Sequence, residues 1–124
     1  MRAQKKEIQG IVNALQSNKP VTRSQFSLLE RECQNVVGSL FKRYKLTDII
    51  YSRTLREEVV EDVTTMSLVK ALRGYRSDKG AGFMTYYFSK ARSMTEVQQG
   101  KYYRRFRIVN TISLDDARKT RNDN

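Results

Sequence analysis

The sequence predicts an all-α fold, a small helical bundle that ends in a basic C-terminal tail. Apolar residues recur at intervals of three and four along most of the chain, which is the period of amphipathic helices, and strand-like alternation is hard to find. A single proline, Pro20, interrupts this pattern. The 124 residues suit one domain with a modest core.

The first two helices are separated by a polar break. The first helix is expected over roughly residues 4–17, and Pro20 follows its end closely. Thr22 or Ser24 is placed to cap a second helix that runs to about Tyr44. This helix keeps its apolar side chains on one face, and they are Phe26, Leu29, Cys33, Val36, Val37, Leu40 and Phe41.

Two further helices are expected in the second half of the chain. The β-branched stretch at residues 47–51 is ambiguous between a short strand and a turn of helix. A third helix is expected over about residues 54–72, with an end that is apolar nearly all round and therefore buried. The glycine-rich turn at residues 73–82 leads to a fourth helix over residues 84–99, which Gly100 ends or bends.

These elements divide the chain into three parts. Residues 1–20 hold an N-terminal helix, and residues 21–110 hold the main helical domain. Residues 111–124 form a polar tail that we expect to be poorly packed and flexible.

Charge is the most informative feature of the composition. The 24 lysines and arginines exceed the 13 acidic residues and give a net charge of +11. A surface this basic attracts polyanions, and nucleic acid is the first candidate. A ribosomal protein or a membrane-surface protein would also fit.

The rare residue types narrow the function classes. The chain has no histidine and one cysteine, Cys33, so we expect no internal disulfide, no metal site, no cofactor and a reducing, cytoplasmic location. The absence of histidine also disfavours an enzyme, because much acid–base chemistry near neutral pH uses it. The N-terminus is too polar for a signal peptide, and no apolar run approaches the ~18 residues that span a membrane, so no membrane partner is expected.

The third helix begins with a strongly acidic stretch in an otherwise basic protein. Four carboxylates cover an arc of about 140° on one side of the helix, and they are Glu57, Glu58, Glu61 and Asp62. They fit a solvated helix face with favourable charge near the N-terminus. They also fit a docking face for a basic protein, and the partner must be protein because carboxylates repel DNA phosphates.

Aromatic residues crowd the start of the fourth helix. Phe83 and Tyr87 are four residues apart and can share one buried face. Tyr86 and Phe88 cannot easily join them there, and two cations follow at once, Lys90 and Arg92. The segment therefore fits either core packing or a platform for unstacked bases, on which rings stack on bases and cations hold phosphates.

A second basic and aromatic stretch, KYYRRFR, occupies residues 101–107. Such interleaving suits a nucleic-acid backbone, and a solvated basic tail is the alternative. The chain has no Gly-rich phosphate loop, no nucleophile elbow and no carboxylate pair in a catalytic context.

The order of these segments resembles conserved region 2 of the sigma-70 family, the domain that binds RNA polymerase and opens promoter DNA. The strongest match is SLVKALRGYRSDKGAGFMTYYFSKAR at residues 67–92, where the family reads approximately Gly-Leu-x-x-Ala-x-x-x-Phe-Asp, then Gly-x-x-Phe-Ser-Thr-Tyr-Ala and a later Arg. The matching residues are Leu68, Ala71, Tyr75, Gly80, Phe83, Thr85, Tyr86 and Arg92. VVGSLFKRY at residues 36–44 and ISLDD at residues 112–116 are also similar to family segments. The resemblance covers roughly residues 30–116.

The resemblance implies two partners, the β′ coiled coil of bacterial core RNA polymerase and the non-template strand of promoter DNA. The implied polymerase-binding residues are Glu57, Glu58, Glu61, Asp62 and Thr65. The implied DNA-binding residues are Phe83, Thr85, Tyr86, Tyr87, Phe88, Lys90, Arg92, Lys101, Arg104 and Arg105. Among these, the aromatics at positions 86–88 would stack on flipped bases, Thr85 would contact a base or sugar, the cations would bind phosphates, and Phe83 fits the core better.

The chain departs from the family in ways that limit the transfer. The tandem Trp pair that wedges the duplex open aligns with Ser89 and Lys90, and the acidic docking motif is shifted in register. The residues that read the upstream promoter edge align with Ser93 and Glu96, so base preference does not carry over. The 124 residues contain no segment that resembles the helix-turn-helix domain for the minus-thirty-five element, and a region 2-only chain of this kind resembles the late sigma factors of T4-like bacteriophages. Such factors work in the host cytoplasm and rely on other phage proteins, such as a coactivator.

The sequence therefore predicts a sigma-like initiation factor for an AT-rich minus-ten-type promoter element. Two alternatives stay open. One is a general nucleic-acid-binding protein, in which the acidic helix has no role. The other is an inhibitor or coactivator that binds polymerase through a region 2-like surface without opening promoters.

Overall fold

The structure, a computed structural model, confirms the all-α fold. It describes the backbone of residues 2–50 and 52–122 and the side chains of residues 5–50 and 52–105. Within those ranges the chain forms five α-helices and one 3-10 helix, and it forms no strand. In chain order they are α1 (Arg2–Gln16), α2 (Arg23–Arg43), α3 (Leu46–Ile49), α4 (Arg53–Gly74), η1 (Ser77–Lys79) and α5 (Phe83–Asn122).

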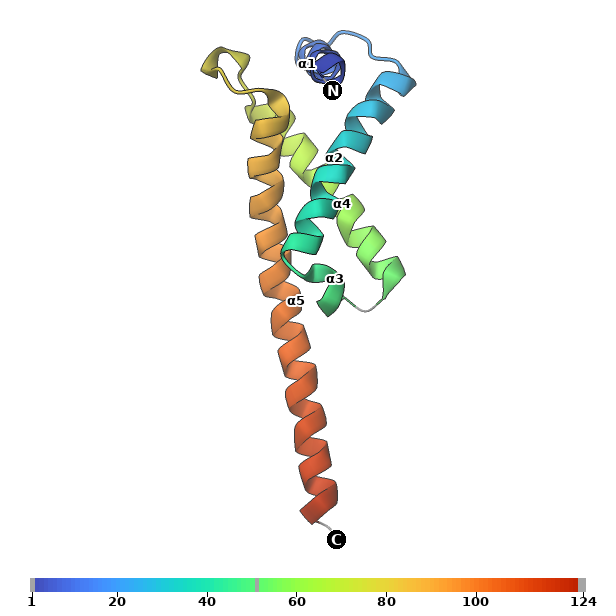
Figure 1. The fold of residues 1–124 in the computed structure, drawn as a ribbon, viewed down its shortest axis with the longest axis vertical. Coiled ribbons are helices and arrows are strands. Elements are labelled where there is room, and N and C mark those ends of the chain that lie inside the picture. The colour runs from blue at the N-terminus through green and yellow to red at the C-terminus, as the bar shows by residue number, and fades with distance from the viewer. Residues whose placement is uncertain (1, 51, 123–124) are drawn as a thin grey trace.

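Three helices, α2, α4 and α5, pack against one another and build the core (Figure 1). Helix α1 lies across one end of this group, close to the start of α5, and adds the buried residues Ile8, Ile11 and Val12 to the core. The short α3 contacts both α2 and α5. Helix α5 runs along the bundle and continues well beyond it (Figure 1).

Helix α2 has the cap and the buried face that its sequence predicts. The Thr22 side chain accepts a hydrogen bond from the Gln25 backbone N–H at 3.1 Å, and the Gln25 side chain accepts one from the Thr22 N–H at 3.0 Å. The buried side chains of α2 are Leu29, Cys33, Val37, Leu40 and Phe41. Burial raises the pKa of the Cys33 thiol to about 12, so the thiol stays protonated and contributes to core packing. Phe26 stays exposed, and Val36 is half-buried.

Helix α4 is buried on one side only, which corrects the expectation that its apolar end is buried all round. Leu68 and Ala71 face the core, whereas Met66 is 51% exposed and Val69 is 42% exposed. The reason is geometric, because α1, α2 and α5 all contact α4 and leave its outer side without a neighbour among the described residues. Val69 and Ala71 project about 160° apart on the helix.

Helix α5 contradicts the expectation that Gly100 ends or bends it. The helix runs without interruption from Phe83 to Asn122, and Gly100 has no positive φ. One glycine costs a helix interior only about 1 kcal/mol, which neighbouring helix-forming residues offset. The backbone of residues 111–122, expected to be a separate tail, belongs to this helix, while the side chains of the tail lie outside the described residues.

The ambiguous stretch at residues 47–51 contributes to helix rather than to a strand. Residues 47–49 fall within α3, which is a single helical turn. Ile50, which follows α3, is buried in the core, and Tyr51 lies outside the described residues.

Candidate nucleic-acid interface

The aromatic residues at the start of α5 divide between core and surface. Phe83 and Tyr87 are fully buried, which confirms that they share one core face. The Tyr87 hydroxyl donates a hydrogen bond to the Thr64 carbonyl of α4 at 3.0 Å, and burial raises the pKa of this hydroxyl well above its ordinary value. The assignment of Tyr87 and Phe83 as base-contacting residues is therefore corrected, since neither ring is exposed to a ligand.

Tyr86 is half-buried and lies against the end of α4. Its ring packs on the Tyr75 ring at a centroid distance of 5.7 Å and a tilt of 53°. Gly74 gives the Tyr86 ring its place, because a Cβ at position 74 would collide with the Tyr86 hydroxyl. The Lys90 ammonium lies 5.3 Å from the centroid of the same ring, within cation–π range. The paired aromatic and cation that the sequence predicts are thus brought together at Tyr86 and Lys90.

A pocket of about 240 Å³ opens beside Tyr86, and we refer to it as the Tyr86 pocket. It is lined by Gly74, Tyr75, Arg76, Lys79, Ala81 and Tyr86. This volume is below the range of about 300–1,000 Å³ that is common for small-molecule sites and suits one flat group. The pocket thus combines two aromatic rings with two cationic side chains from the turn between α4 and α5.

Two cations of this pocket, Arg76 and Lys79, were not among the residues singled out in the sequence. Both lie in the turn directly ahead of α5, where helical periodicity carries no information. The sequence feature that could have identified them is the RSDK segment at residues 76–79, which directly precedes an aromatic helix start. The Arg76 guanidinium is 3.7 Å from the Asp78 carboxylate in a well-exposed pair of small energetic value, and Lys79 pairs with no carboxylate in the described part of the chain.

Phe88 and Arg92 lie on the other flank of α5. Phe88 is 37% exposed, and it projects about 160° away from Tyr86 around the helix. The structure therefore does not bring Tyr86 and Phe88 onto one platform. Thr85 is exposed between the two flanks and lines a separate pocket of about 220 Å³ together with Lys5 and Gln9 of α1.

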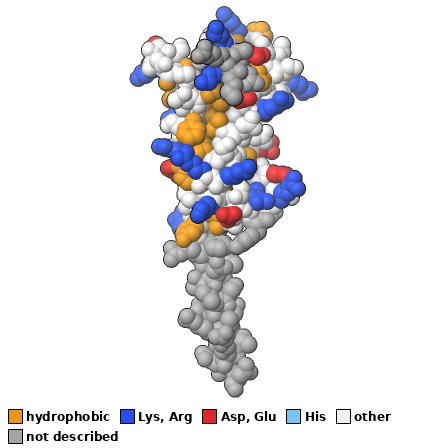
Figure 2. Space-filling model, viewed as in Figure 1, with side chains coloured by type: hydrophobic (Ala, Val, Ile, Leu, Met, Phe, Trp, Pro, Cys, Tyr) orange, Lys and Arg blue, Asp and Glu red, His pale blue; other side chains and the backbone are white. Residues whose placement is uncertain are grey.

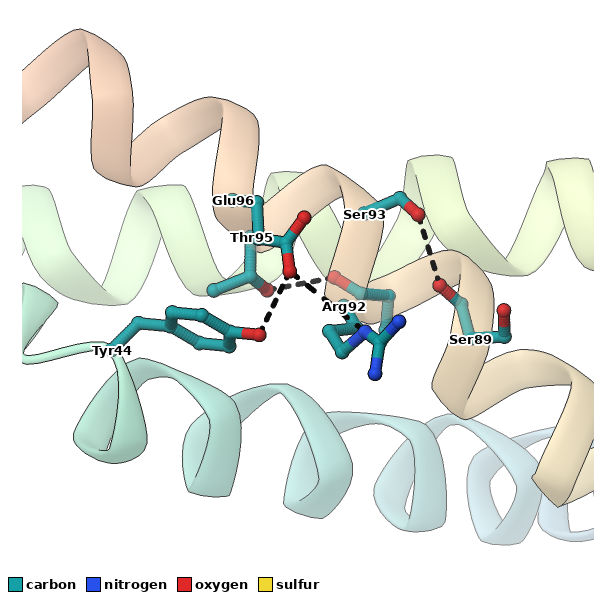
Figure 3. Close-up of polar contacts among 7 residues, drawn as sticks. Tyr44, Ser89, Arg92, Ser93, Thr95 and Glu96 are labelled. Carbon is teal, nitrogen blue, oxygen red and sulfur yellow. Dashed lines mark hydrogen bonds and ion pairs between the residues drawn. The ribbon is translucent and has the colours of Figure 1, made fainter.

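Arg92 belongs to a polar network with α2 (Figure 3). The Glu96 carboxylate accepts a hydrogen bond from the Tyr44 hydroxyl at 2.9 Å and pairs with Arg92 at 3.8 Å. The bond to Glu96 raises the pKa of the Tyr44 hydroxyl above its ordinary value. The Gln99 side chain donates to the Tyr44 carbonyl at 3.0 Å. The Arg92–Glu96 pair is exposed and of small energetic value, so Arg92 stays accessible on this flank of α5.

The cations at positions 101–105 lie farther along α5. Lys101 and Arg105 are both within 5.7 Å of the Tyr102 ring centroid, and the Arg104 side chain donates to the Gly100 carbonyl at 3.1 Å. All three cations are exposed. Their Cα atoms are about 22–29 Å from that of Tyr86 along the helix, so they extend a basic surface rather than join the Tyr86 pocket.

The acidic face predicted on α4 is exposed, together with Thr65. Its members are Glu57, Glu58, Glu61 and Asp62. Glu57 forms an exposed ion pair with Arg53 at 3.2 Å, and no other member pairs with a described cation. Exposed apolar side chains lie among and beside these acids on the same helix, namely Leu55, Met66 and Val69. The face thus offers both negative charge and apolar contact area.

Lysine and arginine side chains are spread over the described part of the face seen in Figure 2, with hydrophobic side chains between them. Within the described residues, no cluster of His, Cys, Asp or Glu is arranged to hold a metal ion, and no helix has the length and hydrophobicity to cross a membrane. No protein-family model, curated protein or solved structure matches this chain.

Proposed function

We propose that this chain is a small transcription initiation factor that binds bacterial core RNA polymerase and opens an AT-rich, minus-ten-type promoter element. The observation that carries the proposal is the Tyr86 pocket, a half-buried aromatic ring framed by Lys79, Lys90 and Arg76. The resemblance to sigma-70 region 2 supports the proposal, because it implies that this segment would lie where a base leaves the duplex.

The chemistry of the pocket suits a single extruded base. The half-buried Tyr86 ring offers an apolar face and is supported from behind by the buried Tyr75 ring, and the cations at the rim attract the flanking phosphates. Extruding a base costs a few kcal/mol, and stacking on an aromatic side chain returns about 1–3 kcal/mol. Pocket capture therefore favours local melting without ATP. Only bases that fit the pocket gain this energy, which is the source of sequence preference.

The outer face of α4 is the proposed contact with polymerase. Its carboxylates complement a basic coiled coil, and the exposed Met66 and Val69 side chains add apolar area that a helical partner would bury. Along α4, Asp62 is about 18 Å from Gly74 at the pocket. The same helix therefore carries the proposed polymerase contact and one wall of the proposed base pocket.

The polymerase contact is tested by charge reversal. The triple variant Glu58→Lys, Glu61→Lys, Asp62→Lys should lose binding to core polymerase, because like charges would then face each other. The matched control reverses three exposed acids elsewhere, Glu7, Glu30 and Asp48, with the same change in net charge. Co-purification with core polymerase is the measurement. Equal binding by both triple variants would sink the docking assignment.

Promoter opening is tested by mapping transcript starts on supercoiled AT-rich templates with core polymerase. The wild-type chain should produce starts that share one upstream motif, and Tyr86→Ala should abolish them while Phe88→Ala, on the opposite flank, should retain most of them. Polymerase binding without starts would favour the inhibitor or coactivator alternative. Nucleic-acid binding without polymerase binding would favour a general nucleic-acid-binding protein.

A further inference from the structure

Helix α1 holds the backbone of Tyr75, the residue that forms one wall of the Tyr86 pocket. The Gln16 side-chain amide donates hydrogen bonds to the Leu72 carbonyl at 3.1 Å and to the Tyr75 carbonyl at 2.8 Å. The last carbonyls of a helix lack partners of their own, and α4 ends at Gly74. One amide group has two N–H donors, so Gln16 satisfies both carbonyls at once.

The same helix also reaches the hydroxyl end of Tyr75. The single hydroxyl hydrogen is shared between the Ala81 carbonyl at 2.9 Å and the Gln9 side-chain oxygen at 3.3 Å. The Gln9 oxygen accepts a further bond from the Phe83 backbone N–H at 3.4 Å. Gln9 therefore links the Tyr75 ring to the first residue of α5.

These contacts bear on Tyr86 because Tyr75 lies directly against it. The Tyr75 ring meets Phe83 edge-on at 5.3 Å and meets Tyr86 at 5.7 Å. Neither glutamine lines the pocket. Helix α1 is itself anchored in the core by its buried isoleucines and Val12. A change at Gln16 would thus alter the pocket through Tyr75 and remove no contact to a ligand.

We propose that Gln16, supported by Gln9, is a positioning residue that sets the shape of the Tyr86 pocket, so that α1 takes part in base capture without touching the base. The inference rests on the proposed function, since it assumes that the pocket receives a base. It assigns a role to the N-terminal helix, which lies ahead of the segments that resemble the sigma-70 family.

The test uses the full chain and compares two strands of DNA. One is a short AT-rich single strand, and the other is the same strand with an abasic site moved through it position by position. The ratio of the two dissociation constants reports the contribution of a captured base. The variants are Gln16→Glu and Gln16→Met, which keep the side-chain length and remove both donors. Gln34→Glu on α2 is the control, because Gln34 is exposed and its side chain makes no hydrogen bond among the described residues.

For the wild-type chain, an abasic site at the captured position should weaken binding about 5- to 150-fold, the equivalent of one stacked base. Both Gln16 variants should reduce this ratio to less than about threefold, whereas Gln34→Glu should keep the wild-type ratio. Circular dichroism establishes that each variant is folded, and the neutral Gln16→Met variant serves if Gln16→Glu is not.

Two results would overturn the inference. If the folded Gln16 variants keep the wild-type ratio, or lose affinity for both strands equally, Gln16 contributes to stability alone and does not position the pocket. If the wild-type chain itself shows no abasic penalty at any position, the base pocket of the proposed function falls, and the inference falls with it. The wild-type measurement alone distinguishes the two failures.

Discussion

At the scale of single residues, adjacent aromatic side chains in α5 have different environments. Tyr87 is buried against Thr64, Tyr86 rests over Gly74, and Phe88 is exposed on the far flank. Because each residue turns the helix by about 100°, consecutive aromatics cannot share a face. The spacing of four residues indicated that Phe83 and Tyr87 can share a buried face, as they do, whereas the family resemblance wrongly assigned Tyr87 to base stacking. The sequence could not decide which ring remains available to a base, because that depends on how α5 packs against α4.

Gly74 is the residue on which the Tyr86 position depends most directly, so Gly74→Ala should separate binding from stability. The new Cβ would displace the Tyr86 hydroxyl, the far end of a movable side chain, so the free energy of unfolding should change by less than about 1 kcal/mol. Affinity for AT-rich single-stranded DNA should fall about tenfold, since the stacking ring is displaced. Urea denaturation and fluorescence anisotropy measure the two quantities.

Gly38→Ala is the control for this substitution, because a Cβ at Gly38 meets no atom within 4 Å and lies on α2. Its affinity for the strand should match that of the wild-type chain. Equal affinity of Gly74→Ala and the wild-type chain would mean that Tyr86 does not stack on a base.

At the scale of helices, apolar periodicity predicted where the helices lie. It did not predict which of their apolar side chains stay exposed or how the turns between them run. The period of three and four located α1, α2 and α4, and Thr22 marked the start of α2 because its capping box is a local feature of the sequence. The exposure of Val69 was missed because periodicity shows that a helix is apolar, and the number of neighbours decides whether it is buried. In the candidate site, Arg76 and Lys79 were missed because they lie in a turn, and helical periodicity does not predict where the side chains of a turn point.

The continuity of α5 leads to a prediction at this scale. Gly100→Ala should increase the free energy of unfolding by about 0.5–1 kcal/mol, or else increase the helix content. Alanine restricts the unfolded chain more than glycine does, and Gly100 is exposed with open space for the new methyl group. Ellipticity at the helix minimum and urea denaturation are the measurements. A loss of ellipticity in Gly100→Ala would contradict a helix that runs through this position.

At the scale of the whole molecule, an acidic face lies on the surface of a strongly basic domain. The net charge of +11 coexists with an acidic face on α4, while cations are spread over the described surface and include two that line the Tyr86 pocket. If the proposed function holds, nucleic acid at the pocket and a basic protein at the acidic face would be attracted to different parts of the molecule.

Salt dependence should report the basic surface of the whole molecule. The double variant Lys79→Ala, Lys90→Ala should flatten the plot of log affinity against log salt by about 1.4 for single-stranded DNA, or about 0.7 for each lost phosphate contact. The control removes two exposed lysines away from the pocket, Lys19 and Lys42, and should leave the slope nearer to the wild-type value. Titration of a labelled strand at several salt concentrations gives the slopes. Equal slopes for the two double variants would show that binding is spread over the surface and does not centre on the pocket.

The length of α5 has a geometric consequence of its own. A continuous helix of 40 residues is about 60 Å long, and Tyr86 lies within its first turn. The backbone at Asn122, where α5 ends, is therefore about 54 Å from Tyr86 along the helix axis, which equals the length of about 16 base-pair steps of duplex DNA. Inserting or deleting whole helical turns in α5 would change this distance in increments of about 5.4 Å.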